Sequence, residues 1–114
     1  MAAALVEIDR ETLWATIQRG ETLVLVDALA PLSYAAAHLP GAINIQPERV
    51  DALAGRRIPD PDTDVVVYCA EADCDASVEV AERLIELGYR NVRHYSGGKA
   101  DWRAAGLPME GGRV

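Results

Sequence analysis

One cysteine, placed between a buried strand and a helix, constrains this chain more than any other feature. The run Val65–Tyr68 consists of β-branched and aromatic residues, which is typical of a strand covered on both faces. After a short polar loop, apolar residues return at helical spacing, at Ala81, Leu84, Ile85 and Leu87. The pattern predicts that Cys69 lies at the carboxyl end of a strand, just ahead of a helix that begins near Ala76.

This position of Cys69 has two physical consequences. Open α/β sheets bind their ligands at the carboxyl ends of the strands. A helix amino terminus offers free N–H groups and the positive end of a dipole, which favour a bound anion or a thiolate, and a stabilised thiolate is a nucleophile at neutral pH. Two interpretations of Cys69 therefore stay open: a reactive nucleophile, or a small buried residue that ends a core strand.

The rest of the chain alternates between strands and helices. Further strands are predicted at residues 5–8, 23–27, 42–45 and 92–95. Helices are predicted after an N-cap at Asp9, over residues 31–38 and 47–53, from residue 76 to residue 88, and over residues 101–105. This alternation indicates one α/β domain over residues 1–114, with a mainly parallel five-stranded sheet and helices on both faces.

Charge and composition narrow the classes of function. The formal net charge of -7 argues against nucleic acid or an anionic membrane as a partner, because both require basic patches. No apolar run is long enough to span a bilayer, and residues 1–4 lack the basic region of a signal peptide, so a cytoplasmic chain is expected. In a reducing compartment, two neighbouring cysteines suggest redox or catalytic chemistry. Since His38 and His94 lie far apart in the sequence, no metal site is expected, and no cofactor.

Several short motifs occur in an order and spacing that one known family shares. In the first half of the chain they are Leu25-Val26-Asp27, Tyr34 and residues 38–44. In the second half they are Val67-Tyr68-Cys69, Gly88-Tyr89, Val92, Gly97-Gly98, Trp102 and residues 106–108. With this combination the chain resembles the rhodanese-like (sulfurtransferase) domain family over nearly its whole length.

The resemblance implies an enzyme of the thiosulfate sulfurtransferase type. Cys69 would attack the outer sulfur of a small sulfur-containing donor and carry that sulfur as a persulfide. It would then pass the sulfur to a thiol or another thiophilic acceptor, which can be a protein. The backbone N–H groups of the loop that runs from Ala70 to Ser77 would cradle the anion and the thiolate. Asp27 ends a strand at the same sheet edge, where we expect it to cap a helix or a turn.

The loop after Cys69 departs from the family pattern. Ser77 aligns with the family's serine, but the loop is two residues longer, and the family's glycine and arginine are missing. Three acidic residues, Glu71, Asp73 and Asp75, stand there instead. These carboxylates oppose a thiolate and an anionic donor unless they point to solvent, in which case Asp73 or Asp75 is expected to cap the following helix. The remaining loop residues are Ala70, Ala72, Cys74 and Ala76.

The stretch after Asp27 also departs from the pattern. Leu29 stands where family members often carry an arginine, and Ser33 stands where they often carry a glutamate. His38 matches a family position that usually serves structure, so we do not expect it to take part in catalysis.

The second cysteine keeps other functions open. Cys74 lies five residues after Cys69, so the two residues can form a dithiol/disulfide redox pair, or a nucleophile and its resolving thiol. The structural alternative is that Cys74 packs beneath the loop as a small apolar residue. A non-catalytic binding domain with this fold would use the acidic loop as a partner surface. A phosphatase or arsenate reductase is disfavoured, because the arginine that clamps the oxyanion in related long loops is missing.

Overall fold

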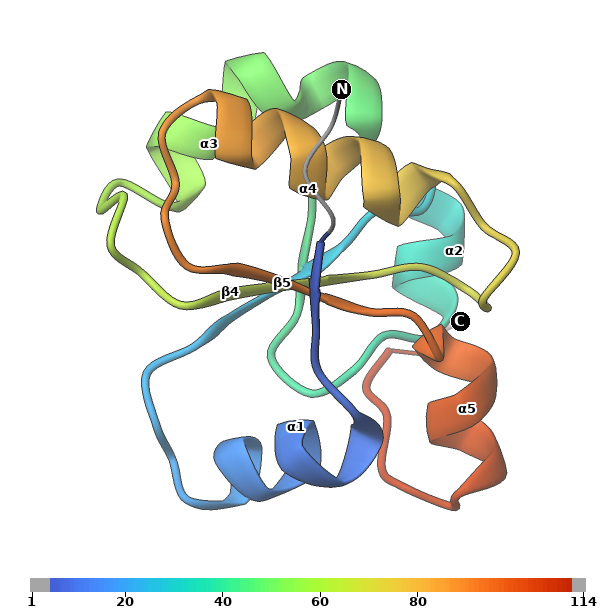
Figure 1. Ribbon diagram of the computed structural model, residues 1–114. Helices are drawn as coiled ribbons and strands as arrows, with labels where there is room; N and C mark the ends of the chain where they lie inside the picture. Colours follow the sequence, from blue (N-terminus) through green and yellow to red (C-terminus); the bar gives the residue numbers. More distant parts are fainter. Residues whose placement is uncertain (1–4, 112–114) are drawn as a thin grey trace.

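A parallel sheet forms the centre of the computed structural model, which describes residues 5–111. Its strands are β1 (Val6–Glu7), β2 (Val24–Asp27), β3 (Ile43–Asn44), β4 (Val65–Tyr68) and β5 (Val92–Tyr95). They follow the order β1-β5-β4-β2-β3, and every neighbouring pair is parallel. The predicted five-stranded α/β fold is confirmed, and β4 is its central strand (Figure 1).

Helices cover both faces of this sheet. They are α1 (Arg10–Gln18), α2 (Pro31–Ala36), α3 (Val50–Arg57), α4 (Ala76–Glu86) and α5 (Gly98–Ala104), with a 3-10 turn η1 (Pro47–Arg49) ahead of α3. Figure 1 shows α3 and α4 on one face and α1 and α5 on the other. The predicted N-cap of α1 is confirmed, because the Asp9 carboxylate accepts a hydrogen bond of 2.7 Å from the backbone N–H of Thr12.

The central strand explains why its sequence is apolar without interruption. Val65 and Val67 pack into the core layer that contains residues of α3 and α4, whereas Val66 and Tyr68 pack into the layer that contains Trp102 of α5. Successive side chains of a strand point to opposite faces, and both faces of β4 are covered. All four side chains are therefore fully buried, as the sequence predicts.

Several element boundaries differ from the sequence-based predictions. β1 has only two residues and lies at the edge of the sheet, with β5 as its neighbour. α5 begins at Gly98 rather than at residue 101, because tertiary hydrogen bonds fix its first turn. The backbone N–H groups of Lys99 and Ala100 donate to the carbonyl oxygens of Cys69 and Ala70, at 3.1 and 2.8 Å. No local sequence signal reports such contacts.

Residues 1–4 and 112–114 lie outside the described part of the chain. The domain boundaries 1–114 and the missing signal peptide at residues 1–4 therefore stay predictions, and so does the cytoplasmic location. Within residues 5–111, no helix has the length and hydrophobicity needed to cross a bilayer.

Candidate active site

The site lies where the connections of the sheet diverge. After β2 the chain proceeds to β3 on one side, and after β4 it passes through α4 to β5 on the other side. β2 and β4 are neighbours, and Asp27 pairs in register with Tyr68. In parallel α/β sheets, ligands bind at such a switch point, outside the carboxyl ends of the strands. Asp27 and Cys69, both singled out from the sequence, lie at this point.

Cys69 is held tightly at the end of β4. Its side chain is buried, and its carbonyl oxygen accepts the hydrogen bond from Lys99 at the start of α5. Gly98 lies against the same peptide: a Cβ atom added to Gly98 would stand 2.5 Å from the carbonyl oxygen of Cys69. Gly98 also has a φ of 62°, in the left-handed region that favours glycine. The close approach of α5 therefore requires glycine and fixes the backbone of Cys69.

The loop after Cys69 curls back on itself. The backbone N–H of Cys74 donates to the carbonyl oxygen of Glu71 at 3.1 Å, which closes a turn. Cys69 and Cys74 form a disulfide, with their Cα atoms 6.1 Å apart. Cys69 is buried, whereas Cys74 is half-buried. The sequence did not decide whether Cys74 lies close enough to Cys69 to bond with it, and the structure brings the two residues together.

The acidic residues of the loop lie on its outer side. Glu71, Asp73 and Asp75 are all exposed, and within residues 5–111 none of them forms an ion pair. Asp75 occupies the N-cap position of α4, but its side chain makes no capping hydrogen bond. The predicted side-chain cap from Asp73 or Asp75 is therefore wrong. The backbone of Asp75 is already helical, with φ -88° and ψ -16°, whereas a capping residue adopts extended backbone. Ala70 and Ala76 are half-buried, and Ala72 is exposed.

Ser77 serves the interior of the fold. It is buried in the first turn of α4, and its Oγ lies 2.8 Å from Nε2 of His94 on β5. Nδ1 of His94 lies 2.9 Å from the Glu7 carboxylate on β1. These contacts link α4 to β5 and, through His94, to β1, so they hold the helix amino terminus that follows the cysteine loop.

Asp27 belongs to a buried polar network beneath the switch point. One carboxylate oxygen accepts a hydrogen bond of 2.9 Å from the backbone N–H of Leu29, which confirms the predicted turn cap. The other accepts a hydrogen bond of 2.9 Å from the Tyr68 hydroxyl and lies 3.4 Å from Nζ of Lys99. Nζ of Lys99 also donates to the carbonyl oxygen of Ser33 at 2.9 Å. Burial, and then the Asp27 carboxylate, raise the pKa of Tyr68 above its usual range, so the phenol remains a donor.

Lys99 is the member of this network that the sequence analysis missed. It is the only lysine of the chain, and it is buried. The sequence did contain one chemical signal for a buried cation. Asp27 ends a strand whose other residues are all apolar, and a buried carboxylate requires a cation or several hydrogen-bond donors. Leu29 offers no charge beside it, so α5 supplies the cation from the far end of the chain.

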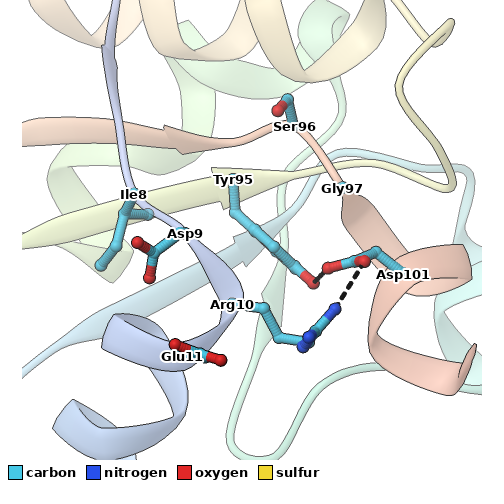
Figure 2. A pocket seen from close by; sticks show the side chains of 8 residues that line it. All are labelled: Ile8, Asp9, Arg10, Glu11, Tyr95, Ser96, Gly97 and Asp101. Atoms are coloured by element: carbon cyan, nitrogen blue, oxygen red, sulfur yellow. Dashed lines mark hydrogen bonds and ion pairs between the residues drawn. The ribbon is translucent and has the colours of Figure 1, made fainter. Parts of the chain in front are cut away.

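A cavity of about 380 Å³ opens at the carboxyl ends of β1 and β5, one strand away from β4 (Figure 2). It is lined by Ile8, Asp9, Arg10, Glu11, Tyr95, Ser96, Gly97 and Asp101. Figure 2 shows that the Asp101 carboxylate accepts hydrogen bonds from the Tyr95 hydroxyl and from Arg10, at 2.6 and 2.8 Å. Burial and then the bond to Asp101 raise the pKa of Tyr95. Arg10, Tyr95 and Asp101 are therefore bonded to one another, and the lining of this cavity does not include Cys69 or Cys74.

Comparison with known proteins agrees with this geometry. The family model described as Rhodanese-like domain matches residues 9–105. The chain is 36% identical over 109 residues to the HTH-type transcriptional regulator Rv0324 of Mycobacterium tuberculosis, an alignment that covers 92% of this chain and 45% of the regulator. It is 31% identical over 104 residues to the thiosulfate sulfurtransferase GlpE of Haemophilus influenzae, with 91% and 93% of the two chains covered.

A solved structure extends the likeness to three dimensions. The BH2092 protein of Bacillus halodurans superposes with a TM-score of 0.86 at 26% identity, over 94% of this chain and 77% of that one. The chain thus spans less than half of the regulator and nearly all of the sulfurtransferase.

Proposed function

Because this chain belongs to the rhodanese-like domain family, we propose that it is a sulfurtransferase whose Cys69 carries the transferred sulfur as a persulfide. One observation carries the proposal: Cys69 ends the central strand at the switch point of the sheet, directly ahead of the loop and of α4. A nucleophile is needed where a ligand binds, and this is the ligand-binding edge of the fold.

The reaction has two displacements at sulfur. The Cys69 thiolate attacks the outer sulfur of a sulfane donor, and the rest of the donor leaves with the electron pair of the broken bond; with thiosulfate the leaving group is sulfite. An acceptor thiolate then attacks the outer sulfur of the persulfide, and Cys69 leaves as a thiolate. The amino terminus of α4 and the loop N–H groups supply the positive potential that both anions require.

The disulfide with Cys74 sets the condition for this reaction. A sulfur in a disulfide is not a thiolate, so Cys69 becomes a nucleophile only after reduction. The acidic loop sets a second condition: although its three carboxylates are exposed, they repel a doubly charged donor over a longer range at low ionic strength, where screening is weak. We therefore expect thiosulfate, with two negative charges, to be a weaker donor than an organic persulfide that carries one.

A dithiol/disulfide redox module is the second candidate. The Cys69–Cys74 disulfide itself favours it, since a redox module needs the pair to close reversibly and needs no sulfur donor. A non-catalytic binding domain would need neither chemistry.

Intact mass spectrometry separates these functions. The chain is reduced, freed of reductant and exposed without oxygen to thiosulfate or to an organic persulfide. A sulfurtransferase in which Cys74→Ala removes the second thiol gains about 32 Da on the peptide that contains Cys69, the mass of one sulfur atom. Cys69→Ser shows no such gain and keeps its melting temperature. A redox module gains no sulfur but exchanges its disulfide with dithiols. A protein that does neither would contradict both candidates.

A further inference from the structure

We propose that Cys74 is a resolving thiol, which discharges the Cys69 persulfide and releases its outer sulfur as sulfide. The inference rests on the proposed function of Cys69 and adds a second step at the same site. It gives the chain a further activity, the reduction of sulfane sulfur to sulfide by a dithiol.

The shape of the loop makes the step possible. An extended segment would separate two residues that are five positions apart by about 16 Å. The turn from Glu71 to Cys74 instead leaves the two Cα atoms 6.1 Å apart, inside the range in which cysteine sulfurs can bond. Both ends of the loop are fixed, because α5 binds the carbonyl oxygen of Cys69 and Ser77 anchors α4 through His94. In the disulfide form, the loop therefore holds Cys74 near Cys69.

The step balances in atoms and electrons. The Cys74 thiolate attacks Sγ of Cys69, the inner sulfur of the persulfide. A bond forms between the two cysteine sulfurs, and the bond between Sγ of Cys69 and the outer sulfur breaks. The outer sulfur leaves with that electron pair as hydrosulfide, so two thiols are oxidised to a disulfide while the sulfane sulfur is reduced. The product is the disulfide that the structure contains.

An external dithiol completes the cycle. Cys74 is half-buried and Cys69 is buried, so the reductant reaches the sulfur of Cys74 first. Attack at Cys74 makes Cys69 the leaving group and regenerates the nucleophile directly. The second thiol of the reductant then releases Cys74 from the mixed disulfide. For each sulfur transferred, one sulfide is formed and one dithiol is oxidised.

The alternative for Cys74 is a structural role, which predicts a different fate for the persulfide. The test compares the wild-type chain of residues 1–114 with Cys74→Ala and Cys74→Ser. Each protein is reduced, freed of reductant without oxygen, and mixed with one equivalent of thiosulfate or of an organic persulfide. Intact mass, free-thiol content and released sulfide are followed over time. Because the chain has only two cysteines, the free-thiol content reports their state directly.

We expect the wild type to release one sulfide for each disulfide formed and to lose both thiols. After loading with thiosulfate, both variants should hold the added sulfur at least tenfold longer and release no sulfide until an external thiol is added. Wild type kept without donor controls for oxidation by air, and the melting temperatures of the reduced proteins control for folding.

Two results distinguish the possible failures. If the persulfide of the wild type lives as long as that of both variants, Cys74 is not a resolving thiol, while the sulfurtransferase proposal stands. If no protein gains sulfur from any donor, the proposed function fails and this inference fails with it.

Discussion

The buried pair of Lys99 and Asp27 gives the sharpest test of how this fold holds its site together. Replacing Lys99 by methionine keeps the length of the side chain and removes the ammonium group. The Asp27 carboxylate is fully buried, so its negative charge would then remain in the interior without a cation. The hydrogen bonds from Leu29 and Tyr68 would remain.

Removing one partner of a buried ion pair costs about 3–5 kcal/mol of unfolding free energy. Since Asp27 keeps two hydrogen bonds, we take the lower end, about 3 kcal/mol. A domain of this size loses about 4 °C of melting temperature for each kcal/mol. We therefore expect Lys99→Met to melt about 12 °C below the wild type.

Urea unfolding measures the effect directly. Tryptophan fluorescence, to which the fully buried Trp102 contributes together with Trp14, reports the transition. The wild type and the variants are compared with the disulfide in the same redox state. Arg103→Met changes an exposed charge on the same helix and should shift stability by no more than about 0.5 kcal/mol. In Lys99→Met combined with Asp27→Asn the unpaired charge is gone, so the double variant should lose less than the sum of the single losses.

Two results would refute this reasoning. Lys99→Met could unfold at the same urea concentration as the wild type, which would mean that the ammonium contributes nothing. Alternatively, the single losses could simply add in the double variant, which would mean that Lys99 and Asp27 do not interact.

Three further predictions concern the loop, α5 and the buried phenols. The triple variant Glu71→Gln, Asp73→Asn and Asp75→Asn should raise kcat/KM for thiosulfate by about tenfold at low ionic strength. The difference from the wild type should vanish in high salt, because salt screens the charges. Equal rates at low salt would show that the carboxylates do not repel the donor. Gly98→Ala should lose more than about 1 kcal/mol of unfolding free energy and slow persulfide formation, because the added Cβ would stand 2.5 Å from the carbonyl oxygen of Cys69. The control Gly55→Ala, whose Cβ would meet nothing within 4 Å, should be neutral or stabilising. Equal melting temperatures of the two variants would contradict the steric argument. Burial raises the pKa of Tyr68 and of Tyr95 in the folded state, so their contribution to the free energy of unfolding is complete below the unfolded pKa of 10.0 and is lost as the pH rises above it. The phenolate absorbance of these two residues should therefore appear only with unfolding. Ionisation of all tyrosines in the folded protein would contradict this prediction.

The features that the sequence predicted correctly share a local cause. The strand Val65–Tyr68 is apolar at every position because both of its faces are covered, and that requirement can be seen in the residues themselves. Asp9 precedes a helical stripe, and its side chain makes the capping bond that this position predicts. Cys69 follows from the same logic, since its place depends only on where β4 ends and α4 begins.

The features that could not be predicted depend on distant segments. Lys99 lies far from Asp27 in the sequence, and only the packing of α5 against the sheet brings the two together. The early start of α5 depends on carbonyl oxygens from the cysteine loop. Asp75 shows the limit of local rules, because it is one of the two residues predicted to cap α4 and occupies the N-cap position, yet its exposed side chain makes no capping hydrogen bond.

The charges around Cys69 lie in two layers, and this separation bears on the chemistry of the site. The inner layer pairs Lys99 with Asp27, so the buried cation is already neutralised within the fold. The outer layer is acidic, with Glu71, Asp73 and Asp75 exposed and the loop free of basic residues. A doubly charged donor is repelled by this outer layer more strongly than a singly charged persulfide, and a neutral dithiol approaches without that cost. Hydrosulfide formed inside the loop is an anion beside carboxylates, so repulsion favours its departure. An acidic loop that opposes the family's anionic donor therefore suits a site that ends its cycle by expelling sulfide.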